Sequence, residues 1–365
     1  MSAVNAIHAR SAKSRAALLG AGLLLLAFGL SGCFSLHYAL QAGAGEFTLL
    51  TSARPNEELL ERPDTAPRLA LLLAAVPLVK QFGESMGLTP TANDQRYTQL
   101  DRPAAVWVVS ACPEFSLAPR LFEFPIAGAV PYLGWFELRA AKDFAATLSA
   151  QKLDVSVRGA AAFSTLGWFD DPLLSSMITP TAHDAALGDL AETVLHESAH
   201  ATLYLPGQSS FNEGLAEFVA LRLTPRFLSA HATSREAHAW TAQRARSAAR
   251  AKLLHAATAQ LEALYASSLS DEEKRAKKAA TLAELAQALH SIRPLNNAVL
   301  SGHRTYSAGQ RGFARLLAAC GDDWRVFFSA LRKLDPAQVA SSNEATLDDL
   351  LERVAERIPA PTLVK

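Results

Sequence analysis

The chain has 365 residues, of which 50% are hydrophobic and 19% are charged. This composition is typical of a globular protein that is long enough to bury a large core. Its 35 basic and 35 acidic side chains give a formal net charge of zero. Because no bulk positive charge is available to attract a polyanion, nucleic acid is excluded as an expected partner.

Residues 1–32 have the proportions of a lipoprotein signal peptide. An uncharged run over residues 16–30, too short for a membrane span of about 20 residues, follows the basic side chains of His8, Arg10, Lys13 and Arg15. The stretch Leu30–Cys33 resembles a bacterial lipobox, in which the cysteine is lipidated and becomes the new N-terminus. Phe34 in place of aspartate favours the outer membrane, facing the periplasm. An ordinary cleaved signal peptide with a chance cysteine is the alternative.

The mature chain, residues 33–365, is predicted to form one α+β domain. Residues 33–95 are predicted to be mostly helical, and residues 96–182 to contain both strands and helices. Residues 183–225 are predicted to form a pair of helices, and residues 226–365 to be helical. Apart from Cys33, the chain has only Cys112 and Cys320. A disulfide between these two is possible in an oxidising compartment, but two buried free thiols are the simpler expectation.

The first two segments contain short elements. Apolar runs predict helices at residues 47–50 and 69–79. Strand-forming residues around Trp107 predict a strand over 104–111, after which proline and glycine interrupt the pattern repeatedly. A helix is predicted over 140–151 and a strand over 153–157.

His196, Glu197 and His200 form an HExxH motif inside a predicted helix over residues 187–205. Helix positions four apart lie on one face, so the two imidazoles can bind one metal ion. Glu197, about 100° around the helix, can reach a water on that ion without being a ligand. With 10 histidines in 365 residues, a shuffled chain contains this motif with a probability of about 1–2%. A metal site is the interpretation, and a chance match is the alternative.

The third ligand is sought on a second helix, predicted from Ser209 or Ser210 to Pro225. If this helix returns antiparallel after a short turn, a rise of about 1.5 Å per residue brings both Glu213 and Glu217 within reach of the histidines. Glu213 is assigned as the ligand, and Glu217 as an outer carboxylate that holds the ring N–H of a ligand histidine. The reverse order is one alternative. A capping box between Ser210 and Glu213 is another.

The remaining chain is predicted to be helical. Thr233–Ala266 and Asp271–Ile292 form an αα-hairpin, with a capping box that begins at Ser270. Later helical segments cover residues 306–334 and 346–356. The first arm of the hairpin has a basic face formed by Arg244, Arg246, Arg250 and Lys252. We interpret this face as solvated, and binding to anionic lipid head groups is the alternative.

The motif HESAH followed by FNEGLAEF resembles the gluzincins, zinc peptidases in which the glutamate of an NE pair is the third ligand. More narrowly, the chain resembles a bacterial family of predicted aminopeptidase lipoproteins. The resemblance runs from about residue 38 to residue 335 and rests on the zinc region together with the stretches 100–109, 124–128, 131–134, 163–172, 295–298 and Tyr306. Two features depart from these patterns. The spacing from His200 to Glu213 is shorter than in the best-known gluzincins, and position 217 in the narrower family is more often a small hydroxyl residue.

The resemblance implies a zincin-like catalytic core with an HExxH helix and an antiparallel edge strand that pairs with an extended peptide. Residues 163–169 are the candidate edge strand, with substrate contacts at Ser164, Thr165, Leu166 and Gly167. Asp170 and Asp171 are candidates for binding a substrate α-ammonium group, and a solvated turn is the alternative.

The resemblance also implies a tyrosine or histidine that stabilises the oxyanion. Tyr306 is the candidate, with His303, Tyr265 and His290 as competitors. The prediction is a lipid-anchored zinc peptidase with one Zn²⁺ per chain, a peptide substrate, and Glu197 as general base and then acid. A catalytically inactive zincin-fold scaffold of the envelope and a non-peptide amide or ester hydrolase are the alternatives.

Overall fold

A computed structural model of the chain describes residues 33–124, 128–162, 170–178, 184–340 and 344–358. The chain divides into two compact units, residues 1–48 and 49–365. The described part of the first unit lies in helix α2 (Cys33–Ser52), where Thr48 Oγ1 donates to the Ala44 carbonyl oxygen at 2.9 Å. The second unit carries all the other elements and the candidate site.

The second unit begins with two helices, α3 (Asn56–Glu61) and α4 (Pro67–Ser85). Pro67 stands in the first turn of α4, where a backbone N–H has no helical partner to lose. The helix continues through Pro77 because its buried face, which includes Leu72, Leu73, Val76 and Val79, packs into the main core. The predicted helix at 69–79 is therefore confirmed.

The main sheet is antiparallel and has the strand order β6–β3–β7. Its strands are β6 (Tyr132–Trp135), β3 (Val106–Cys112) and β7 (Asp154–Ala160). Val109 of β3 stands opposite Leu133 on one side and Val157 on the other. Helix α5 (Leu138–Ser149) connects β6 to β7 and buries Ala141, Ala145 and Leu148. These elements confirm the helix and the two strands predicted for residues 104–157.

Two smaller sheets complete the β structure of the described residues. One has the order β1–β2–β8, with strands β1 (Arg54–Pro55), β2 (Arg96–Thr98) and β8 (Leu173–Leu174). The other pairs β4 (Phe122–Phe124) with β5 (Gly128–Val130). Strands β2 and β8 are parallel, and this pairing brings the chain around residue 171 beside the chain around residue 94.

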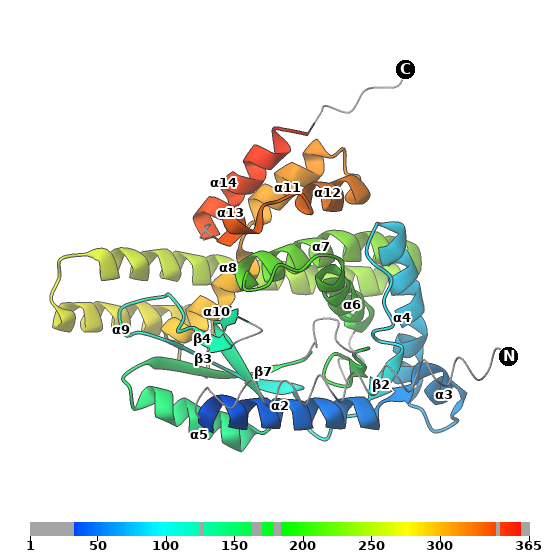
Figure 1. Cartoon of the computed structure of the whole chain (residues 1–365), viewed down its shortest axis with the longest axis horizontal. Helices are drawn as coiled ribbons and strands as arrows, with labels where there is room; N and C mark the ends of the chain where they lie inside the picture. Colours follow the sequence, from blue (N-terminus) through cyan, green and yellow to red (C-terminus); the bar gives the residue numbers. More distant parts are fainter. Residues whose placement is uncertain (1–32, 125–127, 163–169, 179–183, 341–343, 359–365) are drawn as a thin grey trace. The chain divides into compact units, whose positions relative to one another are not determined.

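Four helices follow in the chain. They are α6 (Ala186–Thr202), α7 (Ser209–His231), α8 (Ser234–Ala266) and α9 (Asp271–Ala288). Helices α6 and α7 carry the candidate site, and α8 packs against both. Figure 1 shows α8 running alongside α7, with α9 as the second arm of a long hairpin. The capping box of Ser270 with Glu273 is present as predicted. The basic face of α8 is only partly solvated, because Arg244 forms an ion pair with Glu192 of α6 at 2.8 Å.

Helix α7 extends beyond its predicted end at Pro225 and reaches His231. A proline inside a helix removes one backbone hydrogen bond. Leu223, Phe227 and Leu228, on either side of Pro225, are almost fully buried, so the packing of this turn offsets that loss.

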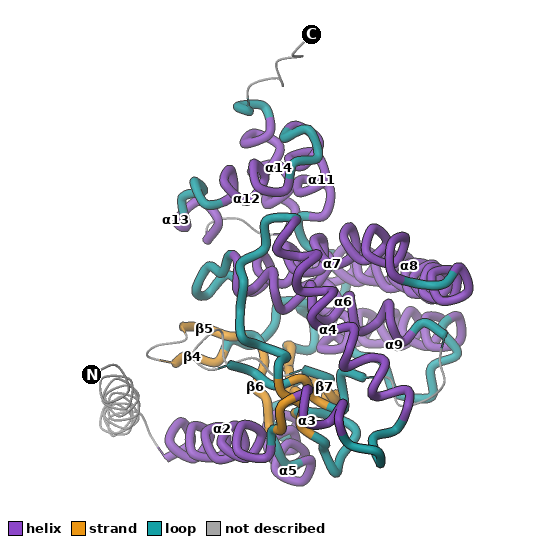
Figure 2. Tube along the Cα trace, turned by 90° about the vertical axis from the view of Figure 1, so that its right-hand side faces the viewer, coloured by secondary structure: helices purple, strands orange, loops and turns teal. Residues whose placement is uncertain are grey.

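Five short helices form the C-terminal part: α10 (Asn297–Ser307), α11 (Gln310–Ala319), α12 (Trp324–Leu331), α13 (Pro336–Ala340) and α14 (Glu344–Ala355). The prediction of one continuous segment over 306–334 was wrong. Gly309 and Gly321 adopt left-handed conformations, with φ of 72° and 68°, and each ends the helical path. Figure 2 shows α11, α12, α13 and α14 grouped next to α7, where Phe313 and Phe327 pack against Phe218.

Cys112 and Cys320 are both buried free thiols, as expected. Within the part of the chain that the structure describes, none of the helices has the length and apolar character needed to cross a membrane.

Candidate metal centre

Helix α6 separates its apolar and polar faces. Leu190, Val194 and Leu195 are fully buried in the main core. His196 and His200 lie on the face toward α7, with side chains only 16% and 10% exposed. Their rings are 4.8 Å apart at an interplanar angle of 85°. One helical turn thus presents two imidazoles to the same space, as the spacing predicted.

The turn between α6 and α7 is held by the side chain of Asn212. Its Nδ2 donates to the Leu205 carbonyl oxygen at 2.7 Å, and its Oδ1 accepts from the Leu205 N–H at 2.8 Å. Asn212 is almost fully buried, and Gly207 in the turn has a φ of 75°. These contacts fix the start of α7 against the end of α6. The residue that follows Asn212 is Glu213.

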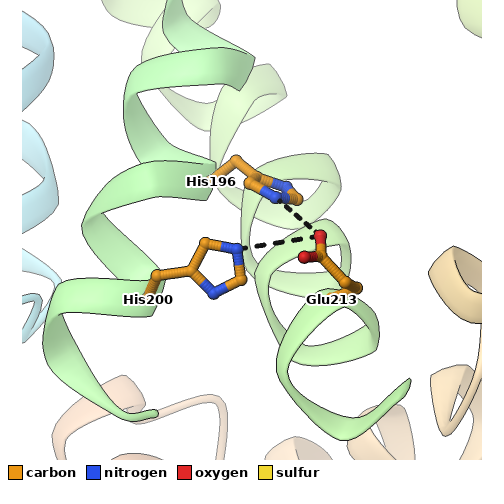
Figure 3. A group of neighbouring side chains, drawn as sticks. All are labelled: His196, His200 and Glu213. Atoms are coloured by element: carbon orange, nitrogen blue, oxygen red, sulfur yellow. Dashed lines mark ion pairs between the residues drawn. The ribbon is translucent and has the colours of Figure 1, made fainter. Parts of the chain in front are cut away.

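Glu213 points between the two histidines (Figure 3). Its Oε2 lies 3.4 Å from His196 Nε2 and 3.7 Å from His200 Nε2. Ligand atoms about 2.1 Å from a tetrahedral zinc ion are about 3.4 Å apart, so these separations fit such an ion. His196, His200 and Glu213 are the one group of at least three possible metal ligands found in the described chain, and their ligand atoms lie within 4.8 Å of one another.

The charges of the centre favour a cation. Burial lowers the pKa of His196, but Glu213, Glu197 and Glu217 outweigh it and raise the pKa to about 9. Burial raises the pKa of Glu213, but the two histidines outweigh it and lower the pKa to about 2. The carboxylates therefore stabilise positive charge between α6 and α7, which is the charge that a divalent ion brings.

Glu213 does not serve as a helix cap. Helix α7 begins at Ser209, its N-cap position is Gln208, and no side chain accepts a hydrogen bond there. The alternative of a capping box with Ser210 is therefore not the one adopted. The carboxylate interacts with the imidazoles instead.

Glu217, one helical turn beyond Glu213, lies behind His196. Its Oε2 is 4.0 Å from His196 Nδ1, on the side of the ring away from Glu213, and its side chain is 28% exposed. Burial raises the pKa of Glu217, while His196 and Arg244 oppose the rise. The structure thus places Glu213 among the potential ligands and Glu217 beside the opposite ring nitrogen.

Glu197 is half-buried next to His196 and belongs to a wider group of acidic residues. Asp94 is 4% exposed, and its backbone N–H donates to the Asp171 carbonyl oxygen at 2.8 Å. Burial raises the pKa of Asp94 to about 7; Lys80 opposes this rise, and Glu197 and Asp171 reinforce it. Of the two predicted ammonium-binding residues nearby, Asp171 is 7% exposed and Asp170 is exposed.

The predicted edge-strand residues Ser164, Thr165, Leu166 and Gly167 lie outside the described residues. Tyr306 lies in α10, and its side chain is likewise outside the description. Its competitor Tyr265 has a structural role, because its hydroxyl donates to Asn297 Oδ1 at 2.7 Å.

The stretch around Asn297 anchors the start of α10. Asn297 is fully buried, and its Nδ2 contacts the carbonyl oxygens of Pro113, Glu114 and Ser116 at 2.9 to 3.1 Å. Asn296 caps α10 through the Val299 N–H and also donates to the Val155 carbonyl oxygen of β7. These contacts fix α10 to the main sheet.

Tyr204 was not predicted as a site residue. Its ring is 6.2 Å from that of His200 and nearly perpendicular to it, and the side chain is 37% exposed. Burial raises the pKa of its hydroxyl, and the charge of Glu213 raises it further. Tyr204 stands four positions after His200 in the helix predicted for residues 187–205, so the face of that predicted helix would have identified it, although α6 itself ends at Thr202.

A family model described as "Putative aminopeptidase" matches residues 37–346. A search among curated proteins and a search among solved structures each gave no match. The family match covers helices α6, α7 and α8 and the whole candidate metal centre.

Proposed function

Because the chain belongs to the putative aminopeptidase family, we propose that it is a zinc-dependent peptidase of the gluzincin type with a zincin-like core. The observation that carries this proposal is the convergence of His196 Nε2, His200 Nε2 and Glu213 Oε2. Two imidazoles and one carboxylate, with a fourth position left open, are the ligand set of catalytic rather than structural zinc sites.

Zinc in such a site supplies an electrophile that polarises a carbonyl group and makes water more acidic. Glu197 follows His196 on α6 and leaves the helix about 100° around its axis, so it flanks the ligands without joining them. We assign Glu197 the task of accepting a proton from the attacking water and passing it to the departing amine nitrogen.

The substrate side of the proposal rests on the main sheet. Strand β7 is an edge of this sheet, and the chain leads from it towards residues 163–169. We keep residues 163–169, which follow β7 in the chain, as the candidate strand to which an extended peptide would add through backbone hydrogen bonds. Of the two acidic residues that follow, the exposed Asp170 is the better candidate for an α-ammonium group, because Asp171 is buried.

The test compares zinc content and cleavage of a peptide library by the wild-type protein and its variants. Glu197→Gln should keep zinc and thermal stability but lose about 10²–10⁴-fold in rate, because the amide cannot accept a proton. Glu213→Ala should lose zinc, whereas Glu217→Ala should weaken binding by only ~10–100-fold. Tyr306→Phe and Tyr204→Phe in the same series identify the oxyanion donor, whose loss should cost roughly 10²–10³-fold in kcat.

Three outcomes contradict this proposal. A wild-type protein without bound zinc excludes the metal site. A Glu217→Ala variant that empties the site while Glu213→Ala does not reverses the ligand order. Full complementation of a deletion strain by Glu197→Gln favours a scaffold over a peptidase.

A further inference from the structure

The face of the main sheet that α10 covers is polar. Residues two apart on a strand share a face, so Ser156 and Arg158 of β7 lie on the face opposite to that of Val157. Ser156 pairs with Ser110 of β3, and Ser110 pairs with Tyr132 of β6, so these side chains lie on the same face. Figure 1 shows α10 next to β3 and β7, against which it packs.

A small pocket lies between this face and α10. It is lined by one guanidinium, three hydroxyl groups and two prolines, from Arg158, Ser110, Tyr132, Ser301, Pro119 and Pro131. Gly302 of α10 also lines the pocket, brings no side chain to fill it, and would carry a Cβ atom that meets nothing within 4 Å. The pocket has a volume of about 20 Å³ and is partly open to solvent. It therefore has room for a single small polar group.

The charge of the pocket favours an anion. Arg158 is the one charged side chain among the described residues that line it. Asp154, on the same face of β7, accepts from Lys278 Nζ at 2.6 Å and from the Asn297 N–H at 3.0 Å. A guanidinium has five N–H donors in a planar fork that matches two carboxylate oxygens, and the three hydroxyl groups can donate as well. The pocket thus suits a carboxylate.

Helix α10 connects this pocket with the candidate metal centre. Ala308, directly after α10, lies so close to Gly214 of α7 that a Cβ atom there would be 2.2 Å from the Ala308 carbonyl oxygen. Gln310 Nε2 also donates to the Gly214 carbonyl oxygen, at 2.8 Å. Gly214 follows the potential ligand Glu213. Ala308 stands six positions after Gly302, or about 9 Å along a helix. An extended peptide covers that length with about three residues.

We propose that this pocket is a subsite for a carboxylate of the peptide substrate, with the Arg158 guanidinium as the group that binds it. The inference rests on the proposed peptidase function and adds a substrate class, short peptides with a carboxylate about three residues from the cleaved bond. Strand β7 leads from Arg158 towards residues 163–169, the candidate substrate strand. The carboxylate is supplied by the C-terminus of the peptide or by an acidic side chain, which present the same chemistry.

The test measures kcat/KM of the full chain for three peptides: an alanine tetrapeptide as free acid, its C-terminal amide, and that amide with glutamate at the third position. Wild type should favour a carboxylate-bearing peptide over the plain amide by about 10-fold or more, because hydrogen bonds between charged groups are strong. The free acid, if favoured, identifies the C-terminus as the source, and the glutamate amide identifies a side chain. Calorimetric binding of the same peptides to Glu197→Gln should show the same preference without turnover.

Arg158→Gln should reduce the preference to within about 2-fold. Arg158→Lys keeps the charge but loses the fork, so it should retain part of the preference. The control is Arg139→Gln on α5, a side chain that is 94% exposed, and it should change nothing. Thermal unfolding checks that each variant is folded.

Equal cleavage and binding of acid and amide by the wild type, a preference that persists in Arg158→Gln, or an equal loss in Arg139→Gln each overturn the subsite. Absence of zinc together with absence of all cleavage overturns the proposed peptidase function instead. The binding comparison with Arg158→Gln then still decides whether the pocket takes a carboxylate.

Discussion

At the scale of single residues, Glu213 has two possible roles, as a helix cap or as a carboxylate facing the two histidines. Its position three residues after Ser210 fits a capping box, but helix α7 begins without any side-chain cap. The carboxylate interacts with two buried imidazoles instead, at 3.4 and 3.7 Å. A capping-box carboxylate would accept from one backbone N–H, whereas here it faces two imidazoles, each of which can carry a positive charge. This placement leaves Glu213 available to a metal ion.

Asp94 leads to a prediction about pH. It is buried at a φ of 64°, and its pKa is raised from 3.8 to about 7, mainly by burial. The folded state then holds this proton more tightly than the unfolded state. Its contribution to stability is present below pH 3.8 and is lost as pH rises towards 7. Each pKa unit corresponds to about 1.4 kcal/mol.

Asp94→Asn should therefore gain stability relative to the wild type as pH rises from 5 to 8, because asparagine has no proton to lose. Asparagine also tolerates the left-handed conformation at this position. Urea unfolding at both pH values measures the difference, with the exposed Asp170→Asn as control. A stability difference between Asp94→Asn and the wild type that does not change with pH would show that Lys80 already compensates the buried charge.

At the scale of secondary structure, Gly214 controls the contact between α7 and α10. A Cβ atom there would lie 2.2 Å from the Ala308 carbonyl oxygen. Gly214→Ala should destabilise the protein by roughly 1–3 kcal/mol, because backbone must move to relieve the overlap. Zinc affinity should fall as well, since Glu213 is the preceding residue.

Gly302, inside α10, is the matched control because a Cβ atom there meets nothing within 4 Å. Gly302→Ala should stabilise the protein by about 0.5–1 kcal/mol through helix propensity alone. Denaturant unfolding of the two variants provides the comparison. Equal stability changes in both would mean that the close approach of α7 to α10 is unimportant.

Helices set by local pattern were predictable from the sequence. The faces of α6 and α8 and the capping box of α9 arise from residues three or four positions apart. Tertiary packing accounts for the errors. The buried turn around Pro225 keeps α7 intact, and left-handed glycines at 309 and 321 divide the segment that was expected to be continuous. Pattern alone does not say whether packing offsets a proline or whether a glycine turns the chain.

In the candidate site too, local sequence pattern predicts some residues, and tertiary packing determines the others. His196 and His200 are one turn apart, so the sequence alone pairs them. Glu213 also required the turn at Leu205, whose geometry depends on the buried Asn212. The contact between Glu192 and Arg244 joins positions 52 residues apart, and no local spacing indicates it. Contacts between helices far apart in the sequence were therefore the least predictable part of this region.

At the scale of the whole molecule, long-range polar contacts tie the α8–α9 hairpin to the main sheet. Lys278 of α9 donates to Asp154 Oδ2 of β7 at 2.6 Å, and Asp154 Oδ2 also accepts the Asn297 N–H at 3.0 Å. The parallel pairing of β2 with β8 spans a similarly long stretch of sequence. Such pairings cost loop-closure entropy and leave no periodic signal, so sequence reasoning found the elements but not their arrangement.

Attachment of the whole molecule to a membrane is expected to depend on Cys33. We propose that acyl chains on Cys33 anchor the protein in the outer membrane, because a basic n-region and a short apolar run precede the lipobox-like Leu30–Cys33, and Phe34 follows it. Cys33→Ser should move the protein from the detergent phase to the aqueous phase, or leave an uncleaved precursor. Zinc content and unfolding should not change, since the candidate centre lies in the unit formed by residues 49–365. Unchanged detergent partitioning of the variant would exclude Cys33 as the anchor, and the Cys112→Ser variant controls for the loss of any thiol.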